Sequence, residues 1–216
     1  MKKLFLLLLF LAAGFLIWHF RLFPQPYYTD ADFGITAFVS GHDEDGDGVD
    51  DQLDILQSAK AYLATDPVYK SKYYENGYPD DQYGVCTDVV AFALLDSGYD
   101  LKQLVYEDVL AHREDYAIDV VDANIDFRRV RNLKVYFEHN WQSLTTDLKE
   151  IEAWQAGDIV TFRGHIGILS DRRDRSGIPY VLHHAGHLQL SFEEDILPYR
   201  EDITGHYRLT GGGNTK

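Results

Sequence analysis

The hydrophobic pattern of this chain changes once, after Gly157, and this change constrains the fold more than any other feature. Before it, apolar residues recur at helical spacing and predict helices over residues 53–63, 86–95, 100–113 and 128–140. After it, Gly, Asp and Ser separate short β-type runs at residues 158–162, 165–170, 178–184 and 205–209. Helices followed by an antiparallel meander predict an α+β domain, in which N-terminal helices pack on a small antiparallel sheet.

The composition allows one such domain and argues against a nucleic-acid partner. The chain has 216 residues, of which 45% are hydrophobic, enough for one well-filled core but not for two. Its formal net charge is -15, whereas nucleic-acid binding draws on Lys and Arg to neutralise phosphates. We therefore expect no nucleic-acid partner.

The N-terminus carries two lysines and then an uncharged apolar stretch from Leu4 to Trp18. This layout is typical of a secretory signal or an N-terminal membrane anchor, and Phe20 and Arg21 extend the stretch. Because bulky residues stand where a signal peptidase needs small ones, we expect an uncleaved anchor over residues 1–21, with a cleaved signal peptide as the alternative. Either way, the remainder of the chain is expected outside the cytoplasm, in the periplasm or the extracellular space.

Residues 42–54, HDEDGDGVDDQLD, contain seven acidic residues and no positive charge. With Asp43 in the first place of a twelve-residue loop, Gly48 is sixth, and the spacing matches an EF-hand-type calcium loop. The predicted ligands are Asp43, Asp45, Asp47, the Val49 carbonyl, Asp51 and Asp54. A structural Ca²⁺ ion would neutralise the repulsion among them. The alternative is a solvated acidic turn that caps the following helix.

Cys86 is the only cysteine, so an internal disulfide is excluded. It opens a predicted helix, where the dipole and free backbone N–H groups favour a thiolate and stabilise an oxyanion. The leading candidate for its base is His165, at the start of a predicted strand, with an orienting group from the next strand. His183 and His184 alternate faces on that strand, so at most one of them points at His165. The alternative for Cys86 is a small buried hydrophobic residue.

Several motifs follow one another in a fixed order around these residues: GVCTDVV, DANIDFRRVRNL, GDIVTF, HIGILSD and ITGHYRL. A Cys that opens a buried helix, then GDIV and HIGIL, then a strand with His before Ala-Gly, resembles the NlpC-like cell-wall peptidases of the papain-like superfamily. The full set is more closely similar to a bacterial family of uncharacterised proteins assigned to that superfamily. The resemblance extends from about Tyr78 to Leu209. It implies a papain-like fold with a nucleophile, a base and a third member at Cys86, His165, and His183 or His184.

The resemblance leaves the third member open. The family commonly has His-Asn where this chain has His183-His184, which favours His183, whereas the NlpC pattern of His followed by Ala favours His184. In the family motif DANIDFRRVRNL, the candidate substrate-binding residues form a charged wall of the cleft, with an Arg fork suited to a peptide carboxylate. Their alternative role is an internal ion-pair cluster that ties the helical half to the sheet. These residues are Asp126, Arg128 and Arg129, and Tyr83 is a further candidate that adds a hydroxyl to the oxyanion hole or serves packing.

The resemblance implies a cell-envelope peptidase or amidase that hydrolyses an amide bond, and together with the predicted export it suggests peptidoglycan peptides as the substrate. Two alternatives stay open: a thioesterase or acyltransferase acting on a lipid-linked substrate, and a catalytically inactive calcium-dependent binding module. We expect structural calcium and no cofactor for catalysis. The predicted layout is an anchor (1–21), a linker with the calcium loop and a helix (22–66, loop 43–54), an NlpC-like hydrolase domain (67–209) and a flexible tail (210–216).

Overall fold

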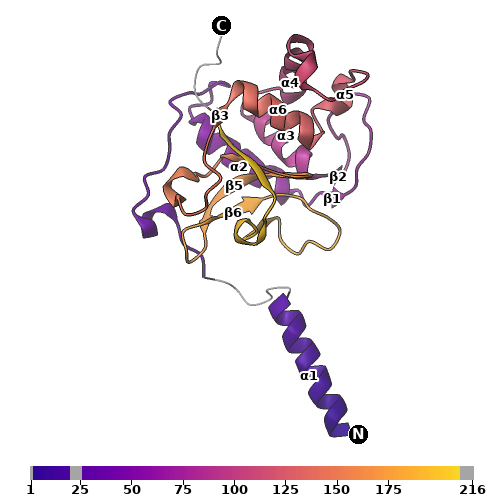
Figure 1. The fold of residues 1–216 in the computed structure, drawn as a ribbon, viewed down its shortest axis with the longest axis vertical. Coiled ribbons are helices and arrows are strands. Elements are labelled where there is room, and N and C mark those ends of the chain that lie inside the picture. Colours follow the sequence, from indigo (N-terminus) through magenta and orange to yellow (C-terminus); the bar gives the residue numbers. More distant parts are fainter. Residues whose placement is uncertain (1, 20–25, 210–216) are drawn as a thin grey trace.

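The computed structural model describes residues 2–19 and 26–209. Its first helix, α1 (Lys2–His19), contains the apolar stretch, and its leucine side chains are exposed. Figure 1 shows α1 standing apart from the body of the protein. Within the described residues, no helix combines the length and the hydrophobicity that crossing a membrane requires. The anchor therefore stays a prediction; its end, the start of the linker and the tail at 210–216 lie outside the described residues.

Helices dominate the first half of the body, as the sequence predicts. The α-helices are α2 (Asp51–Ala64), α3 (Cys86–Asp96), α4 (Leu101–Ala111), α5 (Ala123–Asp126) and α6 (Val130–Asn140). Short 3-10 helices are η1 (Asp30–Phe33), η2 (Arg113–Asp115), η3 (Ile151–Ala153) and η4 (Leu197–Tyr199). The predicted ends of α2, α3, α4 and α6 agree with these bounds to within two residues, and only α5 was not predicted.

Helix α3 lies at the centre of the body because it has no fully polar face. It is buried along most of its length and packs against α2 and β5 (Figure 1). Gly98 follows its C-terminus with a φ of 88°, a left-handed conformation that glycine adopts without steric cost. This confirms the helix end that the sequence predicts.

A six-stranded antiparallel sheet forms the second half and confirms the α+β class. Its spatial order is β3-β8-β4-β5-β6-β7. The strands are β3 (Gln142–Ser143), β4 (Ile159–Phe162), β5 (His165–Arg173), β6 (Pro179–Leu182), β7 (Glu193–Glu194) and β8 (Ile203–Arg208). Two further short strands, β1 (Val68–Tyr69) and β2 (Tyr83–Gly84), pair in parallel beside the helices.

The meander is only part of the sheet, and the prediction of a simple meander is wrong for the last strand. Strands β4 to β7 do follow one another, but β8 returns to lie between β3 and β4. A buried carboxylate explains this pairing. Asp158, just before β4, lies 2.8 Å from Nε2 of His206 and accepts two bonds from Arg208, both on β8. Because a buried charge requires partners, this cluster holds β8 against β4.

Alternate side chains of the sheet enter two apolar clusters, one on each face. Ile159, Ile166, Ile168 and Leu182 belong to the larger cluster, together with residues of α2 and α3. On the other face, the smaller cluster contains Val160, Phe162, Leu169, Val181, Trp154 and Leu197. The sheet is therefore covered on both faces, and neighbouring residues of one strand meet different surroundings.

Candidate active site

Cys86 is the first residue of α3 and is buried, with 9% of its surface exposed. Its thiol lies against the backbone N–H groups of Ile166 and Thr87 and against its own N–H. Ile166 is the second residue of β5, directly after His165. The packing of α3 on β5 thus places the thiol at the start of the strand that carries the predicted base.

His165 and His183 are brought together on neighbouring strands. Nε2 of His165 lies 2.9 Å from Nδ1 of His183, and the two rings meet edge to face with centroids 4.9 Å apart. His183 is buried, and its Nε2 lies 3.2 Å from Oε2 of Glu194 on β7. The side-chain amide of Gln189 donates to the same carboxylate oxygen at 3.2 Å. Three consecutive polar contacts therefore extend from the strand start to the edge of the sheet.

The contact between the two rings links their tautomers, because one of the facing nitrogens must donate and the other must accept. With Nε2 of His165 as the donor, Nδ1 of His183 accepts the hydrogen bond and its proton is on Nε2, 3.2 Å from Oε2 of Glu194. The remaining nitrogen of His165, Nδ1, then carries a free lone pair. Among the described residues it makes no hydrogen bond to the Cys86 thiol: the side chain of Ile166 packs with Cys86, and that of His165 points to the other face of the sheet, against Phe162.

A glycine makes the close approach of the two histidines possible. A Cβ at position 167, two residues after His165, would lie 2.8 Å from the Leu182 carbonyl oxygen and 3.2 Å from Cβ of His183. Any side chain larger than hydrogen would push β6 away from β5. The HIGIL motif therefore supplies both the base and the space for its partner.

His184 lies apart from this pair. Its ring packs edge to face on Tyr69 and Phe192, with centroids 5.1 and 5.0 Å away, and Asp88 of α3 acts on its pKa. Burial lowers that pKa, and Nδ1 of His184 is buried without a hydrogen-bond partner among the described residues. Of the two candidates for the third member, the structure places His183 in contact with His165.

The Cys86 thiol and the His165 imidazole are both neutral at rest. Burial raises the pKa of Cys86 to about 11, although the neighbouring N–H groups act in the opposite direction. Burial also lowers the pKa of His165 to about 3, and the adjacent His183 adds to the shift. Burial therefore outweighs the effect of the helix N-terminus, which favours an ionised thiol.

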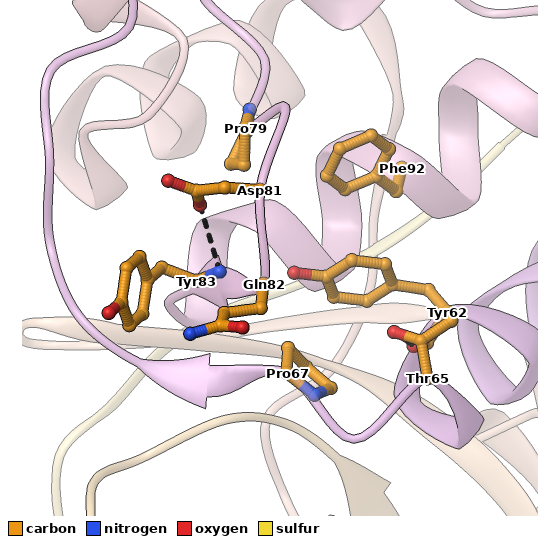
Figure 2. A pocket seen from close by; sticks show the side chains of 8 residues that line it. All are labelled: Tyr62, Thr65, Pro67, Pro79, Asp81, Gln82, Tyr83 and Phe92. Atoms are coloured by element: carbon orange, nitrogen blue, oxygen red, sulfur yellow. Dashed lines mark hydrogen bonds between the residues drawn. The ribbon is translucent and has the colours of Figure 1, made fainter.

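Tyr83 lines a pocket of about 320 Å³ next to the start of α3. Figure 2 shows its walls, which are formed by rings and prolines with a few polar groups: Tyr62, Thr65, Pro67, Pro79, Asp81, Gln82, Tyr83 and Phe92. The Tyr83 ring lies beneath the ammonium groups of Lys70 and Lys72, at 4.6 and 5.1 Å. The hydroxyl of Tyr62 points from α2 toward the loop of Gln82, and it is buried without a hydrogen-bond partner among the described residues (Figure 2).

The Arg128 side chain is buried and makes its hydrogen bonds within the protein. Its Nε and Nη2 donate to the two carboxylate oxygens of Asp88 at 2.6 and 2.9 Å, and Nη1 donates to the Lys72 carbonyl at 2.7 Å. Asp126 is buried and accepts the N–H of Asp122, whereas Arg129 is exposed. This geometry corresponds to the internal ion-pair alternative, except that the pair joins α3 to the α5–α6 segment and not to the sheet.

Three of the predicted calcium ligands converge. Asp43, Asp45 and Asp47 are exposed, and one carboxylate oxygen from each lies within 4.8 Å of the others. Asp43 also accepts the N–H groups of Gly46, Asp47 and Gly48, so the backbone folds around it. At the helical end of the loop, burial raises the pKa of Asp54, and the charges of Asp47 and Asp45 contribute to the increase.

Asp51 turns away from this acidic cluster. It is buried, and its two oxygens accept the Glu44 N–H at 2.9 Å and the Tyr99 hydroxyl at 2.5 Å. Val49 donates its N–H to Asp47 at 2.7 Å. The loop is also pressed on the end of α3, because a Cβ on Gly98 would lie 3.1 Å from the Asp45 nitrogen. Asp51 therefore fixes the loop to the body and does not join the three converging carboxylates.

A family described as "Domain of unknown function (DUF1287)" matches residues 56–209. The chain belongs to this family. The "Uncharacterized protein YijF" of Escherichia coli (strain K12) is 37% identical over 161 residues, which cover 70% of this chain and 77% of that protein. No solved structure matches the chain. The matched residues include Cys86, His165 and His183, whereas the acidic loop precedes them.

Sequence reasoning missed Glu194, Gln189 and the Ile166 N–H. Glu194 comes from a two-residue strand that follows an irregular loop, and its neighbour Glu193 bonds Ser170 instead. The side chains of two adjacent residues in a strand point to opposite faces of the sheet, so one of the two glutamates lies on the same face as His183. The register that decides which one is not visible in the local pattern.

Proposed function

We propose that this chain is a cell-envelope cysteine hydrolase, a peptidase or amidase of papain-like, NlpC-like architecture with a Cys86-His165-His183 site. The observation that carries the proposal is the series of contacts His165–His183–Glu194, which starts on the strand whose second residue, Ile166, presents its N–H to the Cys86 thiol. A nucleophile at a helix start, a base and an orienting group are the parts that acyl transfer requires. The order of the motifs in the chain supports the same assignment.

In the proposed reaction, the His165 side chain first rotates around the start of β5 to reach the thiol; Sγ of Cys86 then attacks the amide carbonyl carbon while Nδ1 of His165 takes the thiol proton. Because the resting thiol has a pKa of about 11, this transfer accompanies the attack and does not precede it. Backbone N–H groups at the start of α3 stabilise the oxyanion. The C–N bond breaks as His165 gives its proton to the leaving amine. Water then attacks the thioester, His165 accepts its proton, and loss of the acid restores the thiol.

The substrate proposed is a peptidoglycan peptide, and the domain is proposed to lie outside the cytoplasm, held by an N-terminal anchor. The pocket beside Tyr83 has apolar walls with few polar groups, as binding sites for small organic groups do. Asp81 in its wall is already paired with Lys72 and accepts the Tyr83 N–H. The pocket therefore suits an apolar side chain of the substrate better than a charged one.

The direct test is incubation of the purified protein with muropeptides, followed by mass spectrometry. We expect a mass gain of one water and cleavage at one amide, lost in Cys86→Ser and in His165→Ala. Glu194→Gln should lower kcat because the tautomer of His183 is no longer fixed, with little effect on KM. His42→Ala, an exposed histidine outside the site, is the matched control. Release of a thiol or alcohol from a lipid-linked ester, without amide cleavage, would instead identify a thioesterase or acyltransferase.

The inactive binding module is the second candidate, favoured by the burial of Cys86 and by its raised pKa. An activated ester that acylates thiols separates the two. A working site should acylate Cys86 and then release the acyl group to water, with both steps lost in His165→Ala. If acylation is slow and proceeds at the same rate in the parent and in His165→Ala, the result would support the binding module and contradict the hydrolase.

We further propose that the loop over residues 43–54 binds a structural calcium ion. The convergence of Asp43, Asp45 and Asp47 supports this, as does Asp54 close to them at the start of α2. Oxygen ligands from alternate residues are what Ca²⁺ prefers. The position of Asp51 argues that it supports the loop from behind, through Tyr99 and the N–H of Glu44.

Thermal unfolding with calcium and with a chelator tests the loop. Binding to the native state alone should stabilise it by about 2.7 kcal/mol at a hundredfold excess over Kd. Asp47→Ala should abolish the difference, while Asp119→Ala, an exposed acid outside the loop, should preserve it. Identical melting curves for the parent with and without calcium would leave the solvated acidic turn as the explanation.

A further inference from the structure

A second group of metal-ligating side chains lies where the C-terminal ends of α4 and α6 meet. Asp108 on α4, His112 at its C-cap and His139 on α6 each offer one ligand atom, and these atoms lie within 4.8 Å of one another. Nδ1 of His139 is 2.7 Å from Oδ2 of Asp108, and Nε2 of His112 is 3.9 Å from Oδ1. The two imidazole centroids are 4.9 Å apart. One carboxylate is thus flanked by two imidazoles.

His139 lies between two carboxylates. Its two ring nitrogens both face carboxylates, Nδ1 toward Asp108 at 2.7 Å and Nε2 toward Asp115 at 3.5 Å. The two carboxylates and the imidazole thus form one polar cluster in which Asp115 lies behind His139 as seen from Asp108. The carbonyl ends of two helices add negative potential at the same place.

His112 extends this argument. At 3.9 Å its Nε2 is too far from Oδ1 of Asp108 for a hydrogen bond, and yet it is the ring nitrogen nearer to that carboxylate in the cluster. Zn–N and Zn–O bonds of about 2.0–2.2 Å in a tetrahedral site place ligand atoms about 3.3–3.6 Å apart. The nitrogens of His139 and His112 lie 2.7 Å from Oδ2 and 3.9 Å from Oδ1 of Asp108, on either side of this range. Small side-chain rotations would therefore equalise these distances around one ion.

We propose that Asp108, His112 and His139 bind a first-row transition-metal ion, with Zn²⁺ as the best fit to two imidazoles and a carboxylate. Water occupies the fourth position, because the side chain of His112 is 51% exposed. Asp115 orients His139, and the Tyr116 hydroxyl and the Asn140 amide orient Asp108. The ion joins the ends of α4 and α6 and stabilises the helical half of the protein.

The site is separate from the proposed hydrolase, because none of its residues contacts Cys86, His165 or His183 in the described structure. It also differs in chemistry from the acidic loop, which offers only oxygen ligands and so suits Ca²⁺. A test can therefore distinguish all three sites by the metal that is added and by the residue that is changed.

The experiment uses the metal-free full chain carrying Cys86→Ala, which removes the only thiol as a competing ligand. Co²⁺ is titrated by its visible d–d absorption and then displaced by Zn²⁺, with millimolar Ca²⁺ present throughout to saturate the loop. We expect about one ion per chain with nitrogen and oxygen ligands. His112→Ala should remove the spectrum, and Asp115→Asn should weaken binding by about tenfold.

His42→Ala is the matched control and should leave the spectrum unchanged, since His42 is exposed and outside the cluster. Because His112 is also exposed, its loss should leave the far-ultraviolet circular dichroism unaltered. Zinc should raise the melting temperature of the parent and not that of His112→Ala. The proposal is overturned if zinc does not bind at micromolar concentration, or if His112→Ala and the parent bind it equally.

Discussion

The ion pair between Asp88 and Arg128 allows a test of the role of Arg128. A structural role predicts a loss of stability when Arg128 is replaced, whereas a substrate-binding role predicts a raised KM. The side chains of Arg128 and Asp88 are 2% and 0% exposed. Arg128→Ala would leave the Asp88 carboxylate with the Val85 N–H as its donor among the described residues and would free the Lys72 carbonyl. Removing one partner of a buried pair costs about 3–5 kcal/mol. That is a large part of the usual stability of a domain.

Urea unfolding of the variants measures this cost. Arg129→Ala is the matched control, since the neighbouring side chain is exposed, and it should change the free energy of unfolding by less than about 0.5 kcal/mol. Adding Asp88→Asn to Arg128→Met should recover part of the loss, because no unpaired charge stays buried and Asn still accepts the Val85 N–H. An Arg128→Ala variant as stable as Arg129→Ala would refute the reasoning and return Arg128 to the role of a substrate-binding residue, seen then as a raised KM.

Three further predictions concern the site and the N-terminus. The pKa of His165 is lowered from 6.5 to about 3, so between these pH values the unfolded chain binds a proton at this residue and the folded chain does not. The free energy of unfolding should therefore fall as pH drops from about 6.5 toward 3. His165→Ala should reduce this loss in acid unfolding curves. Alkylation of Cys86 by iodoacetamide should be slow at neutral pH and should keep rising beyond the pH at which a free thiol levels off, since its pKa is about 11; a rate that levels off near neutrality would contradict this. The chain without residues 1–26 should fold and stay soluble, because the exposed leucines of α1 are then removed; partition of this form into detergent would count against the anchor.

The helices were predictable because their signals are local. Apolar spacing and the left-handed Gly98 give the bounds of α3, and the same pattern gives α2, α4 and α6. The position of β8 was not predictable in this way. It depends on a carboxylate at Asp158 meeting His206 and Arg208 from the far end of the chain, and periodicity carries no information on such pairs.

The chemical state of Cys86 was also beyond local reasoning. A helix N-terminus favours a thiolate within its first turn, and this is visible in the sequence. The opposing effect comes from the packing of α3 under β5, which removes water from the thiol and raises its pKa. Since burial depends on the whole fold, a motif that resembles an activated cysteine does not by itself specify one.

The choice between His183 and His184 depends on strand register. Pairing of Ile168 with Leu182 places Gly167 opposite His183, so His183 shares a face with His165 and His184 does not. The pairing shifts between Leu169 and Arg173, where the hairpin is irregular. One residue more or less in that irregularity would exchange the two faces. The alternation of side chains in the sequence predicts that only one of the two histidines contacts His165. The irregular hairpin determines that this histidine is His183, whose Nε2 lies near Glu194.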